Sequence, residues 1–158
     1  MLDGPDKYMG KVRDIARTIR TFYKVAAEID DEAEIARRVR DEDVDTLVSL
    51  MSLGVLKANL FPILLRSHPA AAIEFLRCRY LARHVDYDEG VNGLTSDLSG
   101  YFDEIVSLMG ESALREILHS PGVDRKKLKD RRVREAVAFA VESIDSPAEA
   151  SAWLGRPR

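Results

Sequence analysis

The apolar residues of this chain recur at spacings of three and four along almost its whole length, and this pattern restricts the fold more than any other feature. Such spacing places apolar side chains on one face of an α-helix, because the helix completes a turn in about 3.6 residues. No run shows the alternation of apolar and polar residues that is typical of a half-buried strand. Cys78 is the single cysteine, so no disulfide framework supports the fold. The sequence predicts an all-α, single-domain helical bundle of about six to eight helices over residues 1–158.

The N-terminal segment carries the most regular of these patterns. Its apolar residues form three heptads of an a/d seam, made of Tyr8, Val12, Ile15, Ile19, Phe22, Ala26 and Ile29. This predicts a long N-terminal helix over Pro5–Ile29, which must pack along much of its length. Two interpretations of the seam remain open. It is either a core helix of the bundle or the contact of a homo-oligomer formed through this helix.

The remaining helices follow from the same spacing and from breaks at proline and glycine. We expect helices near Glu32–Arg40, from about Asp43 with a restart or kink at Pro62, from Pro69 to about His84, near Ser99–Met109, near Glu111–His119, from about Asp124 to Ile144, and at 146–154. The last of these begins with a capping box, in which Ser146 is the N-cap and Glu149 follows three residues later. Residues 85–98 are predicted to form the one long loop.

Composition and short motifs exclude several classes of protein. No uncharged run approaches the roughly 20 residues that a membrane span requires, so no membrane is expected. The N-terminus lacks the basic and apolar regions of a signal peptide, so we expect a cytoplasmic location. No metal or cofactor is expected, because the three histidines are scattered and no Gly-rich phosphate loop or paired-cysteine motif is present. The absence of Gln is typical of thermophile proteins.

Charged residues are sorted into blocks, although the chain is nearly neutral with 24 Lys and Arg against 27 Asp and Glu. A first basic stripe lies within about 60° on the N-terminal helix, opposite the apolar seam, and consists of Arg13, Arg17, Arg20 and Lys24. A second basic block, residues 125–134, holds seven cations against Asp130 alone: Arg125, Lys126, Lys127, Lys129, Arg131, Arg132 and Arg134. On a continuous helix the cations of the second block cover most of the circumference. They must therefore be exposed to solvent or form ion pairs with acidic residues.

Two acidic blocks are available to meet it, with nine acids in residues 28–45 and seven in residues 85–114. In one interpretation the blocks pair within the fold or between copies. In the other, the basic residues bind RNA or DNA phosphates and release condensed counterions, while the acids face protein partners. The function we predict is a non-enzymatic accessory or assembly subunit that contacts nucleic-acid phosphates within a nucleoprotein or multiprotein complex. A purely protein-binding scaffold, dimerising through the N-terminal helix, is a further alternative.

One segment of the sequence suggests a catalytic site. Residues 77–84 place four residues between Arg79 and His84 and six between Arg77 and His84. This spacing resembles the R-x(4–6)-H signature of HEPN domains, all-α proteins of about this size, many of which are metal-independent ribonucleases that dimerise around a paired Arg/His cleft. The resemblance implies that Arg stabilises charge on the phosphate and that His transfers a proton. On an unbroken helix, Arg77 and His84 lie within about 20° of one another, whereas Arg79 and His84 lie about 140° apart. The alternative is structural, with His84 placed near a helix C-terminus where its charge suits the helix dipole.

Overall fold

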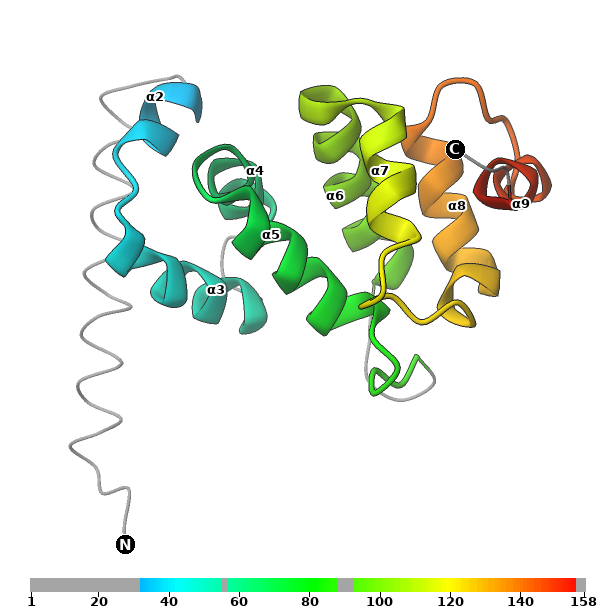
Figure 1. Cartoon of the computed structure of the whole chain (residues 1–158), viewed down its shortest axis with the longest axis horizontal. Coiled ribbons are helices and arrows are strands. Elements are labelled where there is room, and N and C mark those ends of the chain that lie inside the picture. Colours follow the sequence, from blue (N-terminus) through cyan, green and yellow to red (C-terminus); the bar gives the residue numbers. More distant parts are fainter. Residues whose placement is uncertain (1–31, 55–56, 88–92, 156–158) are drawn as a thin grey trace, which may run out of the picture. The chain divides into compact units, whose positions relative to one another are not determined.

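The computed structural model describes residues 32–54, 57–87 and 93–155 (Figure 1). These residues form eight α-helices, two short 3-10 helices and one π-helical segment, with no strand among them. The prediction of an all-α fold is therefore confirmed. The long N-terminal helix predicted over Pro5–Ile29 lies outside the described residues.

The chain divides into two compact units, residues 1–72 and 73–158, and each is described by itself. Helix α5 (Pro69–Leu76) contains the boundary between them. The interpretation of residues 1–158 as a single domain stays a prediction.

The first unit is built around one apolar helix. Its elements before α5 are α2 (Glu32–Arg37), η1 (Asp41–Asp43), α3 (Val44–Ser52) and α4 (Lys57–Ser67). Helix α4 packs against both α2 and α3, and six consecutive residues of α4, from Leu60 to Leu65, are buried. Leu47 and Leu50 of α3 are also buried. Helix α4 and the buried side chains of α3 therefore form the core of the first unit, because a helix that is apolar on most sides must be surrounded by other elements.

The break within the apolar stretch after Asp43 lies at Gly54 and not at Pro62. Gly54 has φ +80°, in the left-handed region that glycine adopts readily. Pro62 lies inside α4, so of the two expectations the restart is wrong and the kink stays a prediction. Proline removes the hydrogen bond to the carbonyl four residues earlier, and its ring crowds that carbonyl. Here that carbonyl belongs to Ala58, an exposed residue near the beginning of α4, where water can replace the missing donor.

The second unit is a layered set of helices with α6 and α8 at its centre. After α5 come η2 (Arg77–Leu81), α6 (Leu94–Met109), α7 (Glu111–Leu118), η3 (Lys127–Lys129), α8 (Arg131–Ala140) and α9 (Pro147–Gly155). Helix α6 packs against α7 and α8, and α8 packs against α9 (Figure 1). Leu98, Phe102 and Ile105 of α6 are completely buried at spacings of four and three. The guanidinium of Arg115 lies 4.4 Å from the ring centre of Trp153, which links α7 to α9.

Two helix ends around the predicted loop differ from expectation. Helix α6 begins at Leu94 and not near Ser99, because Leu94 and Leu98 both enter the core. The helix that begins at Pro69 ends at Leu81, in a π-helical segment, and not near His84. The π turn carries Tyr80 inward, where its hydroxyl donates to Asp97 Oδ2 over 3.0 Å. The burial of Leu94, Leu98 and Tyr80 determines these two helix ends. The spacing of apolar residues alone does not show which of them are buried.

The last two helices test the capping signals. The helix predicted from Asp124 begins at Arg131, seven residues later, because Asp130 caps it. Helix α9 begins at Pro147 as predicted, and the Ser146 hydroxyl accepts a hydrogen bond from the Glu149 amide over 3.3 Å. The C-terminal helix is therefore confirmed with its cap.

Two glycines provide a matched test of the second unit. Gly110 joins α6 to α7 with φ +96° and ψ 163°, a conformation essentially restricted to glycine. Gly100 lies inside α6, where an added Cβ has nothing within 4 Å. Gly110→Ala should lower the free energy of unfolding by about 1–3 kcal/mol, whereas Gly100→Ala should raise it by about 0.5–1 kcal/mol. Urea unfolding followed by circular dichroism measures both, and effects of the same sign would contradict the assigned backbone.

Candidate anion-binding pocket

The second basic block, residues 125–134, does not form one helix. Lys127–Lys129 form the 3-10 helix η3, and α8 begins at Arg131. Asp130 separates the two elements in an extended conformation, and its Oδ1 accepts a hydrogen bond from the amide of Arg132 over 2.8 Å. A carboxylate at this position satisfies one of the free amide groups at a helix N-terminus. The expectation that the cations surround a single helix is therefore wrong.

Asp130 also fixes the side chain of Arg132. The two carboxylate oxygens accept from Nε and Nη2 of that guanidinium over 3.1 and 2.9 Å, a bidentate arrangement. The hydrogen bond from Arg132 holds the pKa of the Asp130 carboxyl below its usual range, against the opposing effect of partial burial. Asp130 thus caps α8 and neutralises one cation of the block at the same time.

Two further cations of the block pair with nearby acids. Lys127 Nζ lies 3.6 Å from Asp124 Oδ2, and Arg131 Nε donates to Glu135 Oε1 over 3.1 Å. The Lys127 side chain is only 15% exposed. These partners lie three or four residues away in the sequence, so this part of the block is compensated from within its own segment.

An aromatic ring supports the compensated part of the block. Lys127 Nζ and the Arg132 guanidinium lie 5.0 and 5.5 Å from the ring centre of Tyr87. The Tyr87 hydroxyl donates to the carbonyl of Tyr80 over 2.6 Å, and burial raises the pKa of that hydroxyl. Residues 125–134 contain no aromatic residue, and Tyr87 comes from the segment between η2 and α6. Because these two cations lie over its ring, Tyr87 supports the side chains of the block. It offers no open aromatic face on which a nucleic-acid base could stack.

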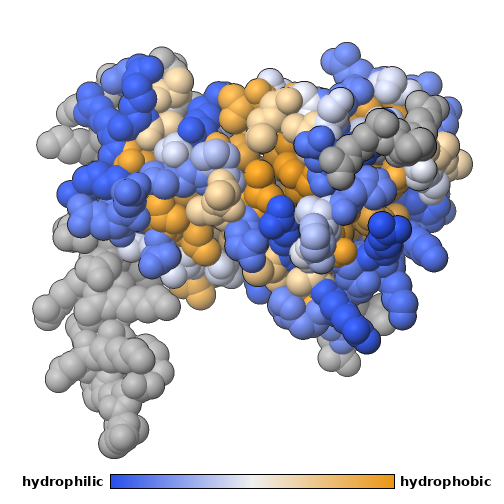
Figure 2. Space-filling model, in the orientation of Figure 1, coloured by the Kyte–Doolittle hydropathy of each residue, from blue (hydrophilic) through white to orange (hydrophobic). Residues whose placement is uncertain are grey.

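The other four cations have no carboxylate within ion-pair distance among residues 32–54, 57–87 and 93–155: Arg125, Lys126, Lys129 and Arg134. Arg134 Nη1 donates to the hydroxyl of Ser151 over 2.9 Å, which links α8 to α9. The Nε atom of Arg134 is buried and has no hydrogen-bond partner. The surface around the beginning of α8 is hydrophilic in the view of Figure 2.

Three of these cations line one pocket of about 320 Å³ in the second unit. Its lining comes from the end of α7, from η3, and from α8 and α9, and consists of His119, Arg125, Leu128, Lys129, Arg134, Ser151, Leu154 and Gly155. No carboxylate is among these residues. His119 Nε2 donates to the carbonyl of Leu154 over 2.5 Å, which holds the end of α7 against α9. An uncompensated group of cations in a recess favours an anionic ligand.

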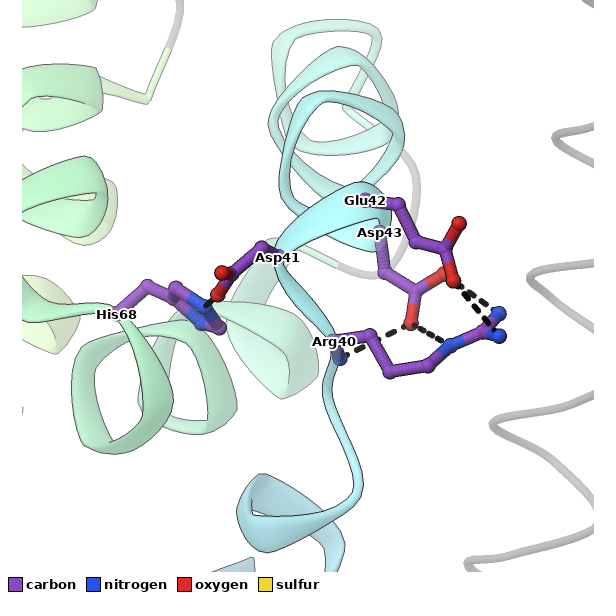
Figure 3. Close-up of polar contacts among 5 residues, drawn as sticks. All are labelled: Arg40, Asp41, Glu42, Asp43 and His68. Atoms are coloured by element: carbon purple, nitrogen blue, oxygen red, sulfur yellow. Dashed lines mark hydrogen bonds and ion pairs between the residues drawn. The ribbon is translucent and has the colours of Figure 1, made fainter.

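The acidic block at residues 28–45 is partly compensated by its own arginines (Figure 3). Arg40 Nη1 lies 2.7 Å from Glu42 Oε1, and Arg40 Nε lies 3.3 Å from Asp43 Oδ2. Asp41 accepts from His68 Nε2 over 2.8 Å, which joins η1 to the residue between α4 and α5. Glu34 pairs with Arg37 in α2. Several acids of this block are therefore already paired with basic side chains of the first unit.

The first basic stripe lies outside the described residues, so its four members stay a prediction: Arg13, Arg17, Arg20 and Lys24.

The segment of the HEPN resemblance lacks the unbroken helix on which Arg77 and His84 were expected to share a face. The helix stops at Leu81 and Ala82 is extended with ψ 156°, so that geometric expectation is wrong. Arg77 pairs with Glu74 over 3.3 Å and its Nε is buried without a partner, while Arg79 and His84 are exposed. The ribonuclease alternative stays a prediction, which requires RNA cleavage in EDTA and its loss in His84→Ala.

Neither a metal group nor a membrane helix is found in the part of the chain that the structure describes. No group of three or more His, Cys, Asp or Glu side chains there could hold a metal ion. No helix there is long and apolar enough to cross a membrane.

Comparison with known proteins identifies no relative: no family, no curated protein and no solved structure matches this chain. Function must therefore be argued from the side chains.

Sequence reasoning identified the cations of the pocket but missed His119 and Ser151. His119 lies just after α7 and Ser151 lies in α9, 15 and 17 residues from Arg134 in the sequence, and no motif joins them to the basic block. Only the packing of α8 against α9 brings Ser151 to Arg134.

Asp130 gives a prediction with a defined pH dependence. Because its pKa is lowered by folding, Asp130 stabilises the protein above about pH 4, and this contribution is lost as the pH falls through the folded-state pKa. Asp130→Asn keeps an acceptor for the helix cap and removes the charge, so its stability deficit should shrink in acid. Asp130→Ala also removes the cap and should cost about 0.5–2 kcal/mol more. Urea unfolding between about pH 2 and 7 measures both variants, and a deficit of Asp130→Asn that stays constant over this range would contradict the ion pair.

Proposed function

We propose that this chain is a non-enzymatic helical subunit that binds the phosphate backbone of a nucleic acid. The observation that supports this proposal is that four cations of the second basic block have no carboxylate partner among the described residues: Arg125, Lys126, Lys129 and Arg134. Cations already paired with acids gain little from a phosphate, because the first partner must be displaced. Uncompensated cations gain by releasing the counterions condensed on the nucleic acid.

The same group of side chains argues for binding without sequence preference. Arg and Lys contacts to phosphates position a nucleic acid but do not read its bases. Base stacking needs an aromatic face that is open, and the Tyr87 ring beside the block is covered by Lys127 and Arg132. RNA and DNA are both possible backbones in this proposal. The larger assembly in which such a subunit acts, and the scaffold that dimerises through the N-terminal helix, stay predictions.

The proposal predicts salt-dependent binding that depends on the uncompensated cations. Fluorescence polarisation with a labelled single strand, at salt concentrations from about 50 to 200 mM, gives the slope of log Kd against log salt. Each phosphate contact contributes about 0.7 to this slope on single strands. The double variant Arg125→Gln/Lys129→Gln should therefore bind more weakly and reduce the slope by about 1.4.

A charge-matched variant in the first unit provides the control. Arg37→Gln/Arg40→Gln also removes two exposed arginines, but both pair with acids of their own segment. Its affinity and slope should remain close to those of the wild type. Absence of binding to RNA and DNA at low salt, or an equal loss in both double variants, would refute the proposed function.

A further inference from the structure

We propose that the pocket lined by Arg125, Lys129 and Arg134 binds the terminal phosphate monoester of a nucleic-acid strand. This inference rests on the proposed function and assigns a separate role to one part of its surface. On a strand without a terminal phosphate, all four cations contact internal phosphates. When the strand ends in a phosphate, Arg125, Lys129 and Arg134 bind that group, and Lys126, which lies outside the pocket, keeps its internal phosphate. The partner class is therefore a nucleic acid that ends in a phosphate.

The charge of the pocket favours a monoester over a diester. A phosphate monoester carries about −1.5 to −2 charges at pH 7 and offers three acceptor oxygens, whereas each phosphate inside a strand carries one charge. Three cations line the pocket without a carboxylate among its lining residues. A group with nearly twice the charge gains more from such a cluster than an internal phosphate does.

Arg134 supplies the group best suited to hold that phosphate. Its Nη1 is fixed by the Ser151 hydroxyl, so the planar guanidinium is held in place before a ligand arrives. Its Nε is buried and has no hydrogen-bond partner, so the donors left for a ligand are the other N–H groups of the two terminal nitrogens. Arg134 lines the pocket, where these groups can donate to an acceptor oxygen. Hydrogen bonds from arginine to phosphate are charge-assisted and about twice as strong as neutral ones.

The size of the pocket favours the end of a strand. A volume of about 320 Å³ is at the lower end of the range for small-ligand pockets, roughly 300–1,000 Å³. An internal phosphate is joined to a nucleotide on both sides, so two segments of the strand must leave a recess that holds it. A terminal phosphate is joined to one nucleotide, so only one segment must leave. The apolar side chains of Leu128 and Leu154 then contact the sugar that follows it.

The test compares three single strands of one sequence, ending in a 5′-phosphate, in a 3′-phosphate, or in hydroxyls at both ends. Fluorescence polarisation with an internal label measures the affinity for each. We expect one phosphorylated strand to bind about tenfold more tightly than the hydroxyl strand. The arm that shows this preference identifies the end that the pocket accepts.

Matched variants separate the pocket from the backbone surface. Arg134→Gln and, independently, Arg125→Gln should reduce the tenfold preference to less than about twofold, and should weaken the hydroxyl strand by no more than the loss of one phosphate contact, as Lys126→Gln does. Lys126→Gln should weaken all three strands by a similar factor and keep the preference. Two pocket variants are used because loss of the bond to Ser151 affects the α8–α9 contact, and urea unfolding shows which variants remain folded.

The failures of the two proposals are distinguishable. If the three strands bind equally, the terminal-phosphate proposal is overturned and backbone binding stands. If no strand binds at low salt, the proposed function falls and this inference falls with it. A preference that survives in both folded pocket variants also overturns the assignment of the pocket.

Discussion

The carboxylate of Asp130 organises the basic surface of the second unit. It is the single acid among the seven cations of residues 125–134. By accepting from the amide of Arg132 it starts α8, and by accepting from the guanidinium of the same residue it removes one charge from the surface. The chain before Asp130 is then free to form η3, which carries Lys129 to the pocket. A continuous helix over the block would distribute the cations around its axis, whereas the cap collects three of them on one recess.

The recess depends on helix packing as much as on charge. Helix α8 packs against α6 with one face, through Val133, Ala136 and Val137, and also packs against α9. The spacing of these buried residues leaves Arg134 beside α9, where it meets Ser151. Contacts between Arg115 and Trp153 and between His119 and Leu154 hold α7 to α9 independently. Helix α9 is therefore held both by the pocket cation Arg134 and by contacts with α7 that use no cation of the pocket.

The helical fold of the described residues was predictable because apolar spacing reports directly on burial. The periodicity of α6, the break at Gly110 and the capping box of α9 each involve residues close together in the sequence. Predictions failed where one side chain overrides periodicity. Asp130 delays the start of α8, and the inward turn of Tyr80 ends the preceding helix before His84. The turn of Tyr80 depends on a tertiary partner, Asp97, whereas the Asp130 cap is a local contact with Arg132. The spacing of apolar residues reports on neither, because both contacts are polar.

The site, like the fold, could be predicted only where it depends on residues close together in the sequence. The cations were recognised as a block, but which of them remain uncompensated depends on geometry. Lys127 and Arg131 each find an acid three or four residues away, while Lys129 does not, although all three lie within five residues. His119 and Ser151 entered the pocket through the packing of α7 and α8 against α9, and no local signal marks either residue. A list of the charged residues in the sequence therefore overestimates the number of uncompensated cations. It also omits the neutral residues that line the pocket.

The near-zero total charge of the chain has little bearing on what this recess attracts. Charges act over about 8–10 Å at moderate salt, so an acid elsewhere in the molecule is screened unless it is a direct neighbour. The acids near the block are engaged by Lys127, Arg131 and Arg132, and those of residues 41–43 are engaged by Arg40 and His68. Mutual repulsion among Arg125, Lys129 and Arg134 opposes the folded state, and an anion in the pocket removes that repulsion. A ligand that binds only the folded state stabilises it by an amount that rises with the ligand's concentration and affinity, so an anion bound in this recess would raise the free energy of unfolding.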